Sequence, residues 1–466
     1  MNNLRPVLIK GARVINPSTS LDSQGDILIV DGKILSCEAN ITPPDDTMLI
    51  EANGMVACPG FIDIHTHLRE PGREDKETIE SGQKAAAKGG FTTITCMPNT
   101  EPAIDNAPVA EFINKKAQDS GIISTLLVGA VSKGRQGIEL SEMEELANSG
   151  VVAFSDDGSP VATGHLMQMA LTYSKELFNS VSGNYGFPII DHCEDYSLTH
   201  GLGVHEGWVA DRLGLLGYPS AGEEAIVARD IALAELTGGH FHAAHVSSQG
   251  SIDLIRQAKL RGIKVTAEVT PHHLTMSEEW VMGIHGESKP SHPLSLKAYD
   301  PMAKVSPPLR SIADQKALVS ALREGIIDCI ATDHAPHTFS DKAQPFDEAA
   351  VGISVLETAF GSLMSLVHSG QLELHTLIHR LTLAPIQVLG LSNLGLGNIS
   401  VGSIADVVLF DPELQWEVNP NDFLSKGKNT PLAGEVLKGK VKLTIAKGRI
   451  VFDSENKMLD VRNSFA

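Results

Sequence analysis

The chain of 466 residues is long enough for a large hydrophobic core and an additional small module. Hydrophobic residues make up 42% of the sequence and charged residues 20%, which is an ordinary composition for a globular protein. The formal net charge of −20 argues against binding to nucleic-acid phosphates or anionic membranes, and an anionic ligand would need a local positive site.

The five cysteines are scattered without C-x-x-C spacing, which argues against a disulfide framework and against a thiolate zinc site. Near the start of the chain, Arg5, Lys10 and Arg13 interrupt the apolar runs. No stretch reaches the roughly 18 apolar residues that a membrane-spanning helix needs. We therefore predict a cytoplasmic protein.

The two ends of the chain share one pattern. Residues 1–57 contain short strand-like runs such as VLIKGARVI, separated by turns rich in Gly, Asp and Pro. Residues 396–466 show similar runs, such as VKLTIAKGRIVF, with little helical period between them. Since the termini of a folded domain usually lie close together, we predict that both segments form one small β-sandwich module.

Between these ends, residues 58–395 alternate short apolar runs with longer segments rich in Ala, Leu, Glu and Lys. The runs are GFIDI, TTITCM, STLLVGAV, VVAFS, FPIID, FHAAHV, IKVTAEV and IIDCIAT. Strands that alternate with helices form parallel sheets, and eight such units predict an α/β fold, a closed TIM-like (β/α)8 barrel. An open doubly wound sheet is the alternative, but no G-x-G-x-x-G motif follows the first run.

The segments between the runs complete this prediction. Helices are expected at residues 77–88, 107–120, 141–149, 223–237, 251–261 and 314–324. Two further segments, 180–186 and 283–301, are predicted to be long loops. The second lies between the seventh and eighth runs, and we interpret it as an insertion rather than a lid.

Chemically active side chains follow the ends of several of these runs. In chain order they are His65, His67, Arg69, Asn99, Asp156, Asp157, His192, His245, Asp333 and His337. Each has an ordinary explanation on its own: an H-x-H pair arises by chance, and an Asp at a strand end is often a helix cap. In a barrel, however, the carboxyl ends of all strands meet on one rim, where the active site lies. We therefore predict one shared site.

The types of side chain indicate which ion this site would hold. Imidazole and carboxylate without thiolate suit Zn²⁺ or a similar divalent cation, and two His pairs with shared acids indicate two ions. One carboxylate must bridge them, because two bare dications repel strongly in a pocket of low dielectric. A shared water would then be acidic enough to supply hydroxide near pH 7. Arg69, two residues beyond His67, is predicted to clamp a substrate carboxylate rather than form a surface salt bridge.

These residues lie within longer motifs that resemble a known family. The motifs are DIHTHLREPGREDKETIESGQKAAAKGGFTTITCMPNT, AFSDDG, DHCED, AHVSSQGS, TAEVTPHHL, PPLR, ATDHAPH and KGKNTP. In this order, and over nearly the whole chain, they resemble the class I bacterial dihydroorotases of the amidohydrolase superfamily. The resemblance implies a metal-dependent cyclic amide hydrolase of pyrimidine biosynthesis, which reversibly cyclises N-carbamoyl-L-aspartate to L-dihydroorotate.

The resemblance also assigns metal ligands. His65 and His67 resemble ligands of a first zinc ion, and His192 and His245 resemble ligands of a second. Asp157 occupies the bridging place that a carboxylated lysine fills in relatives, and AFSDDG contains no lysine. The implied cofactor is therefore a binuclear centre of two Zn²⁺ ions per subunit, bridged by Asp157 and a hydroxide. The neighbouring acid of the motif, Asp156, is expected to orient a ligand or a loop.

The remaining positions concern the substrate. Asp333 resembles both a ligand of the first zinc and the catalytic general acid/base. Substrate binding is implied for His67, Arg69, Asn99, Ser306, His337, Val351 and Gly352. Two places depart from the family: Ser306 stands before PPLR where Asn is usual, and Val351 and Gly352 stand where a PFG element is usual. Both changes affect recognition of the ring and leave the metal ligands intact.

Two other functions stay open at this point. A related cyclic amidase, such as a hydantoinase, dihydropyrimidinase or allantoinase, would share the metal site, but the predicted clamp at Arg69 favours dihydroorotate. An inactive dihydroorotase-like partner of aspartate transcarbamoylase should have lost metal ligands, and none is lost here. The partners we expect are a small-molecule substrate with a carboxylate, a second copy in a homodimer, and aspartate transcarbamoylase, with no nucleic acid and no membrane.

Overall fold

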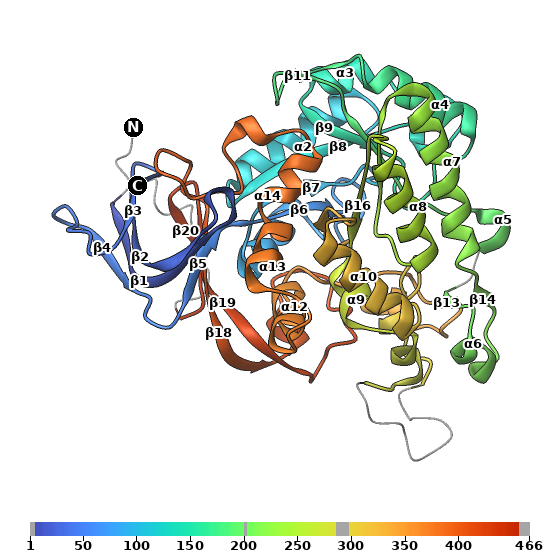
Figure 1. Ribbon diagram of the computed structural model, residues 1–466. Helices are drawn as coiled ribbons and strands as arrows, with labels where there is room; N and C mark the ends of the chain where they lie inside the picture. Colours follow the sequence, from blue (N-terminus) through green and yellow to red (C-terminus); the bar gives the residue numbers. More distant parts are fainter. Residues whose placement is uncertain (1–4, 200–202, 286–297, 456–466) are drawn as a thin grey trace.

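The computed structural model describes residues 5–199, 203–285 and 298–455, and its larger part is a barrel of eight parallel strands (Figure 1). The strands are neighbours in chain order, from the first to the last. They are β6 (Phe61–Thr66), β7 (Phe91–Cys96), β8 (Ser124–Ala130), β9 (Val151–Ser155), β12 (Pro188–Asp191), β15 (His240–Ala243), β16 (Val265–Val269) and β17 (Cys329–Ile330). Each overlaps one of the eight predicted runs. The predicted (β/α)8 barrel is therefore confirmed.

The barrel closes between its first and last strands. Thr66, at the end of β6, forms a parallel bridge with His334, which follows β17. The N–H of His67 also donates to the His334 carbonyl at 2.9 Å. All residues of β6, β7 and β9 are buried, as expected for a parallel sheet covered on both faces. Closure thus places the ends of β6 and β17 side by side.

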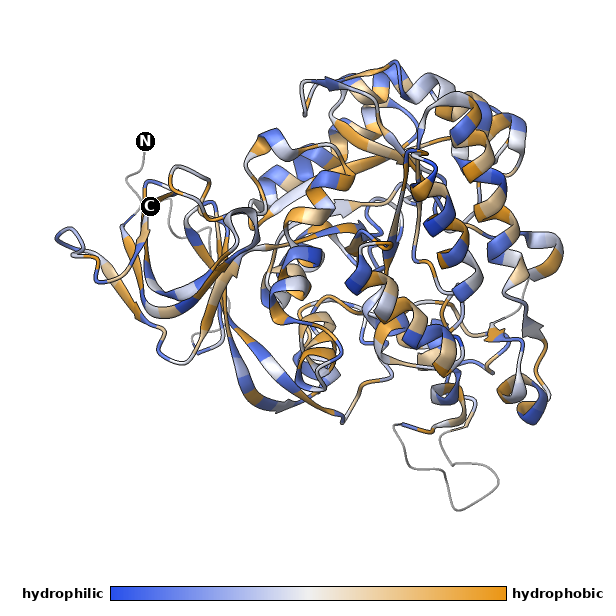
Figure 2. Cartoon of the chain, viewed as in Figure 1, coloured by the Kyte–Doolittle hydropathy of each residue, from blue (hydrophilic) through white to orange (hydrophobic). Residues whose placement is uncertain are grey.

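Helices follow most of the strands and surround the barrel (Figure 1). They are α1 (Ile79–Gly89), α2 (Ala107–Ser120), α3 (Met143–Asn148), α4 (Gly164–Ser174), α5 (Tyr196–Thr199), α6 (Trp208–Leu213), α7 (Ala221–Thr237), α8 (Gln249–Leu260), α9 (Pro271–Thr275), α10 (Ile312–Glu324), α11 (Phe339–Lys342), α12 (Ala359–His368), α13 (Leu374–Leu381) and α14 (Leu383–Val388). The six predicted helices match α1, α2, α3, α7, α8 and α10 to within three residues at each end. Most of these helices carry hydrophobic and hydrophilic residues in bands along their length (Figure 2), the pattern of a helix with one buried face.

A second, mixed sheet lies beside the barrel and takes strands from both ends of the chain (Figure 1). Its strands are β1 (Val7–Asn16), β2 (Leu21–Val30), β3 (Lys33–Glu38), β4 (Met48–Glu51), β5 (Val56–Pro59), β18 (Val407–Glu417), β19 (Val436–Ala446) and β20 (Arg449–Asp453). The two ends meet where β5 pairs antiparallel with β18. The predicted module made from both termini is therefore confirmed, while its boundaries at residues 57 and 395 stay a prediction.

The structure tests only one of the two loop predictions. Residues 180–186 are not a simple long loop, because β10 (Phe178–Asn179) and β11 (Asn184–Tyr185) form a short antiparallel hairpin there. Its turn is held by the Asn179 side chain, which accepts from two backbone N–H groups. In the second segment, residues 286–297 lie outside the described residues, so the role of the 283–301 insertion stays a prediction. A two-stranded sheet of β13 (Val204–His205) and β14 (Gly217–Tyr218) stands near α6.

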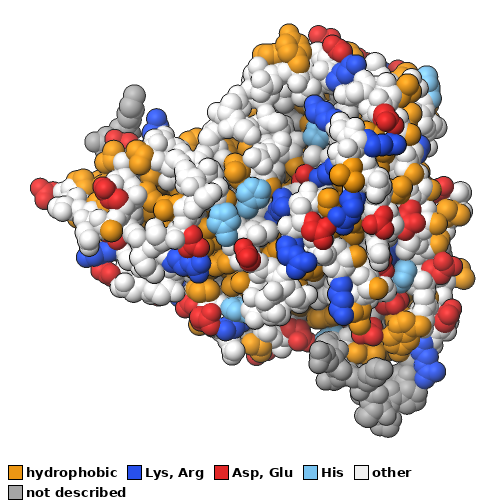
Figure 3. Space-filling model, viewed as in Figure 1, with side chains coloured by type: hydrophobic (Ala, Val, Ile, Leu, Met, Phe, Trp, Pro, Cys, Tyr) orange, Lys and Arg blue, Asp and Glu red, His pale blue; other side chains and the backbone are white. Residues whose placement is uncertain are grey.

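Figure 3 shows how charged side chains are distributed on one face of the molecule. On the face shown in Figure 3, Lys and Arg side chains are interspersed with Asp and Glu. This face therefore has no continuous positive surface of the kind that binds a nucleic-acid backbone. Within the described part of the chain, no helix combines the length and the apolar character needed to cross a membrane.

Aromatic rings join the barrel to the terminal sheet. Phe61 on β6 stacks on Phe360 of α12 with ring centroids 5.1 Å apart, and it meets the edge of Phe91 at 5.7 Å. Phe360 in turn contacts Phe410 of β18 at 4.5 Å. Phe61 has no exposed surface. This cluster couples the base of the first barrel strand to the sheet made from the termini.

The variant Phe61→Ala is expected to lower the free energy of unfolding by about 3–5 kcal/mol, because the lost ring leaves a cavity that rigid strands cannot fill. Urea titration followed by circular dichroism measures this change. The control is Phe339→Ala, whose ring is 82% exposed, and which should change stability by less than about 0.5 kcal/mol. Equal losses in the two variants would contradict the role of the cluster.

Candidate metal centre

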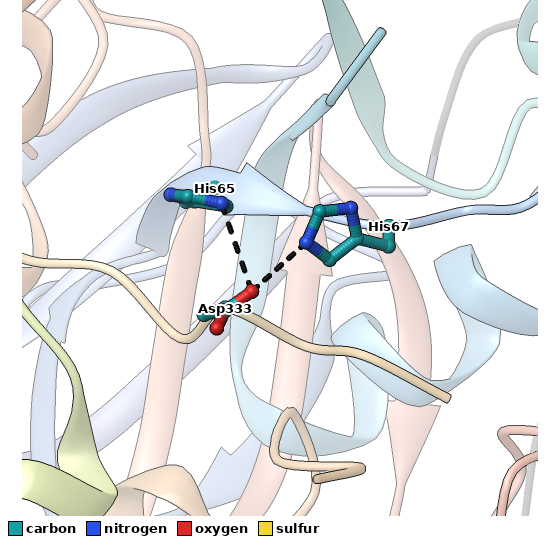
Figure 4. A group of neighbouring side chains, drawn as sticks. All are labelled: His65, His67 and Asp333. Carbon is teal, nitrogen blue, oxygen red and sulfur yellow. Dashed lines mark hydrogen bonds and ion pairs between the residues drawn. The ribbon is translucent and has the colours of Figure 1, made fainter. Parts of the chain in front are cut away.

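His65 and His67 lie at the carboxyl end of β6, and both imidazoles point toward Asp333 (Figure 4). The Oδ1 atom of Asp333 is 2.9 Å from the Nε2 atom of His67 and 3.6 Å from that of His65. Asp333 follows β17 and has a φ of 47°, in the left-handed region that Asp tolerates better than most residues. Closure of the barrel thus brings the predicted ligands at the end of the first strand close to the predicted ligand that follows the last strand.

Asp157 lies between the two predicted His pairs. Its Oδ1 atom is 3.2 Å from His65 Nε2, 3.5 Å from His245 Nε2 and 3.7 Å from His192 Nδ1. Its Oδ2 atom is 3.4 Å from His67 Nε2. One carboxylate therefore faces four imidazoles, an arrangement that suits a ligand shared between two ions.

The electrostatics of Asp157 follow from this environment. Burial raises the pKa of its carboxyl, but the imidazoles of His65, His192 and His245 outweigh burial and hold the pKa well below its usual range. Asp157 is therefore a carboxylate at neutral pH, which is the form that binds a metal.

The donor atoms fit a divalent cation. His65 Nε2 and Asp157 Oδ1 are buried, and neither has a hydrogen-bond partner among the described residues. Ligand atoms of His65, His67 and Asp333 lie within 4.8 Å of one another, as do those of His65, Asp157 and His245. Imidazole and carboxylate donors are typical ligands of zinc and related ions. The structure thus brings all six predicted metal ligands together, although it does not test their roles.

Glu268 is an important residue of this centre that the sequence reasoning missed. It lies on β16 with no exposed surface, and it accepts a 2.5 Å hydrogen bond from Nδ1 of His65. It also contacts His242 Nε2 at 3.2 Å and accepts from the backbone N–H of His245. Burial raises its pKa, but His65 and His242 lower it to about 2. A carboxylate inside the apolar run IKVTAEV was the signal that could have identified it.

Other carboxylates and amides orient the remaining imidazoles. Asn99 accepts from Nδ1 of His67 at 2.9 Å, and Glu194, also missed from the sequence, lies 2.9 Å from Nε2 of His192. Partners of this kind fix the tautomer and ring orientation of a ligand histidine. Asp156 instead accepts hydrogen bonds from the backbone and hydroxyl of Ser132. It therefore holds the loop after β8, and its carboxylate forms no hydrogen bond or ion pair with an imidazole of the described residues.

A cavity of about 440 Å³ opens above these side chains. It is lined by five of the six predicted ligands, His67, Asp157, His192, His245 and Asp333, and by Arg69, Asn99, Ser306, His337, Val351 and Gly352. All the residues predicted to bind substrate therefore share one cavity with the candidate metal centre. Glu194, Tyr196, Lys304 and Asp347 also line it and were not predicted.

Arg69 supplies positive charge to this cavity. It has a φ of 62°, and its Nε atom has no hydrogen-bond partner in the described ranges. Burial lowers its pKa to about 10, and the negative charges of Asp333 and Asp157 oppose that shift. The guanidinium therefore stays charged at neutral pH and has a free donor.

His337 lines the cavity, and both of its ring nitrogens contact other groups of the protein. Its Nε2 atom lies 2.8 Å from the Val351 carbonyl, so it carries the hydrogen, and its Nδ1 atom lies 3.1 Å from Lys76 Nζ. Burial and the charges of Arg69 and Lys76 lower its pKa to about 3. The neutral ring therefore already uses both nitrogens, and its clearest action is to hold Val351.

The sequence is similar to those of known proteins over most of its length. A family model described as "Dihydro-orotase-like" matches residues 54–251. The chain is 44% identical over 450 residues to a protein named dihydroorotase from Syntrophus aciditrophicus, covering 96% of this chain and 100% of that protein. It is 43% identical over 447 residues to one of the same name from Aquifex aeolicus, covering 96% and 99% of the two chains.

Solved structures share the fold. An L-hydantoinase (dihydropyrimidinase) from Arthrobacter aurescens superimposes with a TM-score of 0.82 at 24% identity, covering 98% of each chain. A dihydropyrimidinase from Brevibacillus agri gives 0.80 at 24% identity, covering 97% of this chain and 96% of that one. At this identity the likeness establishes the fold only.

The variant Glu268→Gln is expected to weaken binding of a divalent cation by about 10- to 100-fold, because His65 loses the charge that orients it and makes it basic. Competition with a chelator, with Zn²⁺ as the probe ion, measures the affinity. Glu413→Gln is the control, since Glu413 pairs only with Lys438 at the surface. Unchanged affinity in Glu268→Gln would show that Glu268 does not support the centre.

Proposed function

The chain belongs to the dihydroorotase family of cyclic amide hydrolases, and from this premise we propose that it catalyses the reversible cyclisation of N-carbamoyl-L-aspartate to L-dihydroorotate. One observation carries the proposal: a cavity lined by the His and Asp cluster also contains Arg69 with an unused donor. A cation beside the reactive centre suits a substrate that carries a carboxylate next to its amide.

We propose two Zn²⁺ ions as the cofactor. His65, His67 and Asp333 would hold the first, His192 and His245 the second, and Asp157 would bridge them together with a hydroxide. The position of Asp157 among four imidazoles supports this assignment. When bound, the two ions would acidify the attacking water and polarise the amide carbonyl.

Asp333 is the proposed proton carrier. Burial raises the pKa of its carboxyl, but His67 and His65 lower it below the usual range, so the group is a carboxylate at neutral pH. In hydrolysis, water adds to the ring carbonyl carbon, and Asp333 accepts the proton that the water loses. It then passes this proton to the amide nitrogen as the C–N bond breaks.

The synthetic direction uses the same residue in reverse. Asp333 removes the proton from the ureido nitrogen, and that nitrogen attacks the carbon of the side-chain carboxyl group. One carboxyl oxygen leaves as water after it receives this proton from Asp333 and a second proton from the solvent. The carboxylate is a poor electrophile, so charge stabilisation around the developing tetrahedral centre is essential.

Arg69 and Asn99 are proposed to bind the carboxylate that does not react. Asn99 uses its oxygen on His67, which leaves its amide nitrogen available to the cavity. The ring would then lie against Ser306, Val351 and Gly352. The hydroxyl of Ser306 has no hydrogen-bond partner within the described ranges, and so it is free to meet a ring atom.

We also propose partners and a location for the protein. The family resemblance is the support for a homodimer and for association with aspartate transcarbamoylase. A cytoplasmic location is supported by the cysteines, all five of which are free thiols, as expected in a reducing compartment.

The variant Asp333→Ala should keep the fold but lower turnover of dihydroorotate by about 10²- to 10⁴-fold, because the proton carrier is lost. Steady-state kinetics on zinc-supplemented protein measures this, with circular dichroism as the check on folding. Asp253→Ala, an exposed position on α8, should retain the parental rate. Near-parental turnover in Asp333→Ala would rule out the assigned role.

The variant Arg69→Met should lower kcat/KM for dihydroorotate by about 10- to 100-fold, the loss of one charged hydrogen-bonding pair. Dihydrouracil, which has the same ring without the carboxylate, should lose less than about threefold. Arg73→Met is the matched control, because Arg73 pairs with Asp75 at the surface. Parental protein that prefers hydantoin, dihydrouracil or allantoin over dihydroorotate would overturn the proposed substrate in favour of the related amidases.

A further inference from the structure

Lys342 is a buried lysine that the proposed chemistry does not use. It ends helix α11, and its side chain has no exposed surface. Its ammonium donates to the carbonyls of Ala350 at 2.8 Å, Gly352 at 3.0 Å and Lys304 at 3.4 Å. No carboxylate of the described residues lies within ion-pair distance of its Nζ atom. The three main-chain carbonyls therefore replace the water that a lysine normally keeps.

These carbonyls belong to two segments that line the cavity. Lys304 and Ser306 come from one segment, and Val351 and Gly352 come from the other. The segments are also joined directly, because the N–H of Gly352 donates to the Lys304 carbonyl at 2.9 Å. Lys342 thus joins the two segments of the cavity wall, residues 304–306 and 350–352. These segments contain Ser306, Val351 and Gly352, the positions where this chain departs from the usual family pattern.

Other contacts act on the same segment from the opposite side. Asn429 donates its amide to the carbonyls of Gly352 and Ala335, each at 3.0 Å, and His337 donates to the Val351 carbonyl. Gly352 has a φ of 130°, and a Cβ atom there would lie 2.6 Å from that of Ala335. The backbone path through residue 352 is therefore tightly constrained.

The residues fixed in this way line the cavity. In the part of the chain that the structure describes, the N–H of Val351 and the hydroxyl of Ser306 have no hydrogen-bond partner. Burial of Lys342 is costly, as its pKa shows: burial lowers it to about 7, although Asp300 opposes the shift. An expensive buried ammonium that holds a wall in place is typical of a site that needs fixed geometry.

We propose that Lys342 is a positioning residue that sets the wall of the cavity, so that the Val351 N–H and the Ser306 hydroxyl meet the ureide edge of the substrate ring. The inference rests on the proposed function, because that function supplies a ring with N–H and C=O groups. Lys342 itself does not touch the substrate. It acts through the carbonyls of residues 304, 350 and 352.

The test variant is Lys342→Met, which keeps the length of the side chain and removes its donors. Two probe inhibitors separate ring recognition from the rest of the site: orotate has the ring and its ureide edge, whereas L-malate has only carboxylates and a hydroxyl. Lys342→Met should weaken inhibition by orotate and raise KM for dihydroorotate by about tenfold each, with kcat within about threefold and L-malate inhibition unchanged. A general loss of folding would instead weaken inhibition by both orotate and L-malate.

The matched control is Lys175→Met. Lys175 also donates to a main-chain carbonyl, that of Thr237 at 2.8 Å, but it lies outside the cavity. Equal orotate inhibition in Lys342→Met and Lys175→Met would overturn the proposal. If Lys342→Met does not fold, Asn429→Asp is the second test variant, because it loses the donation to the same Gly352 carbonyl. It should weaken inhibition by orotate and leave inhibition by L-malate unchanged. Unchanged inhibition by orotate in Asn429→Asp would then overturn the proposal.

A second measurement separates this inference from the proposed function. Hydrogen exchange of a peptide that spans residues 345–356 reports whether Lys342 holds the segment, whatever the substrate is. Faster exchange in Lys342→Met than in Lys175→Met supports the clamp, and equal rates contradict it. Failure of the parental protein to convert dihydroorotate would instead overturn the proposed function.

Discussion

A buried carboxylate surrounded by imidazoles is the constraint on which this structure depends. Asp157 is buried at the floor of the cavity, and four histidine rings face its two oxygens. Such a concentration of polar atoms is unfavourable unless every lone pair is matched. A cation between these atoms resolves the conflict, and the unpaired Nε2 of His65 and Oδ1 of Asp157 are where it is needed. Binding of a divalent cation would therefore also stabilise the fold of this rim.

The closed barrel makes that arrangement possible. His67 and Asp333 are 266 residues apart in the chain, yet their side chains meet because β6 and β17 are joined at the seam. His65 on β6 and Glu268 on β16, 203 residues apart, are not on neighbouring strands, so their contact runs through the barrel interior. Strands hold ligands more rigidly than loops do, which suits a centre that tolerates little displacement.

The cavity wall that we propose to recognise the ring has a different construction. It is made from loops between α9 and α12, and its shape comes from hydrogen bonds by buried side chains to main-chain carbonyls, above all from Lys342 and Asn429. The same barrel occurs in hydantoinases at 24% identity. One fold can carry different functions, because function depends on the side chains of the site and not on the barrel itself.

The sequence by itself determined the barrel, the two-ended β module and the candidate ligands, because apolar runs and strand-end residues are local patterns. It also placed the metal ligands on one rim, since a barrel leaves no other place for strand ends to meet. Only the tertiary structure decided that Glu268 supports His65, that His337 is occupied by Val351, and that Lys342 is buried. Those facts depend on which side chains of non-neighbouring segments face one another, and no periodicity along the chain records that.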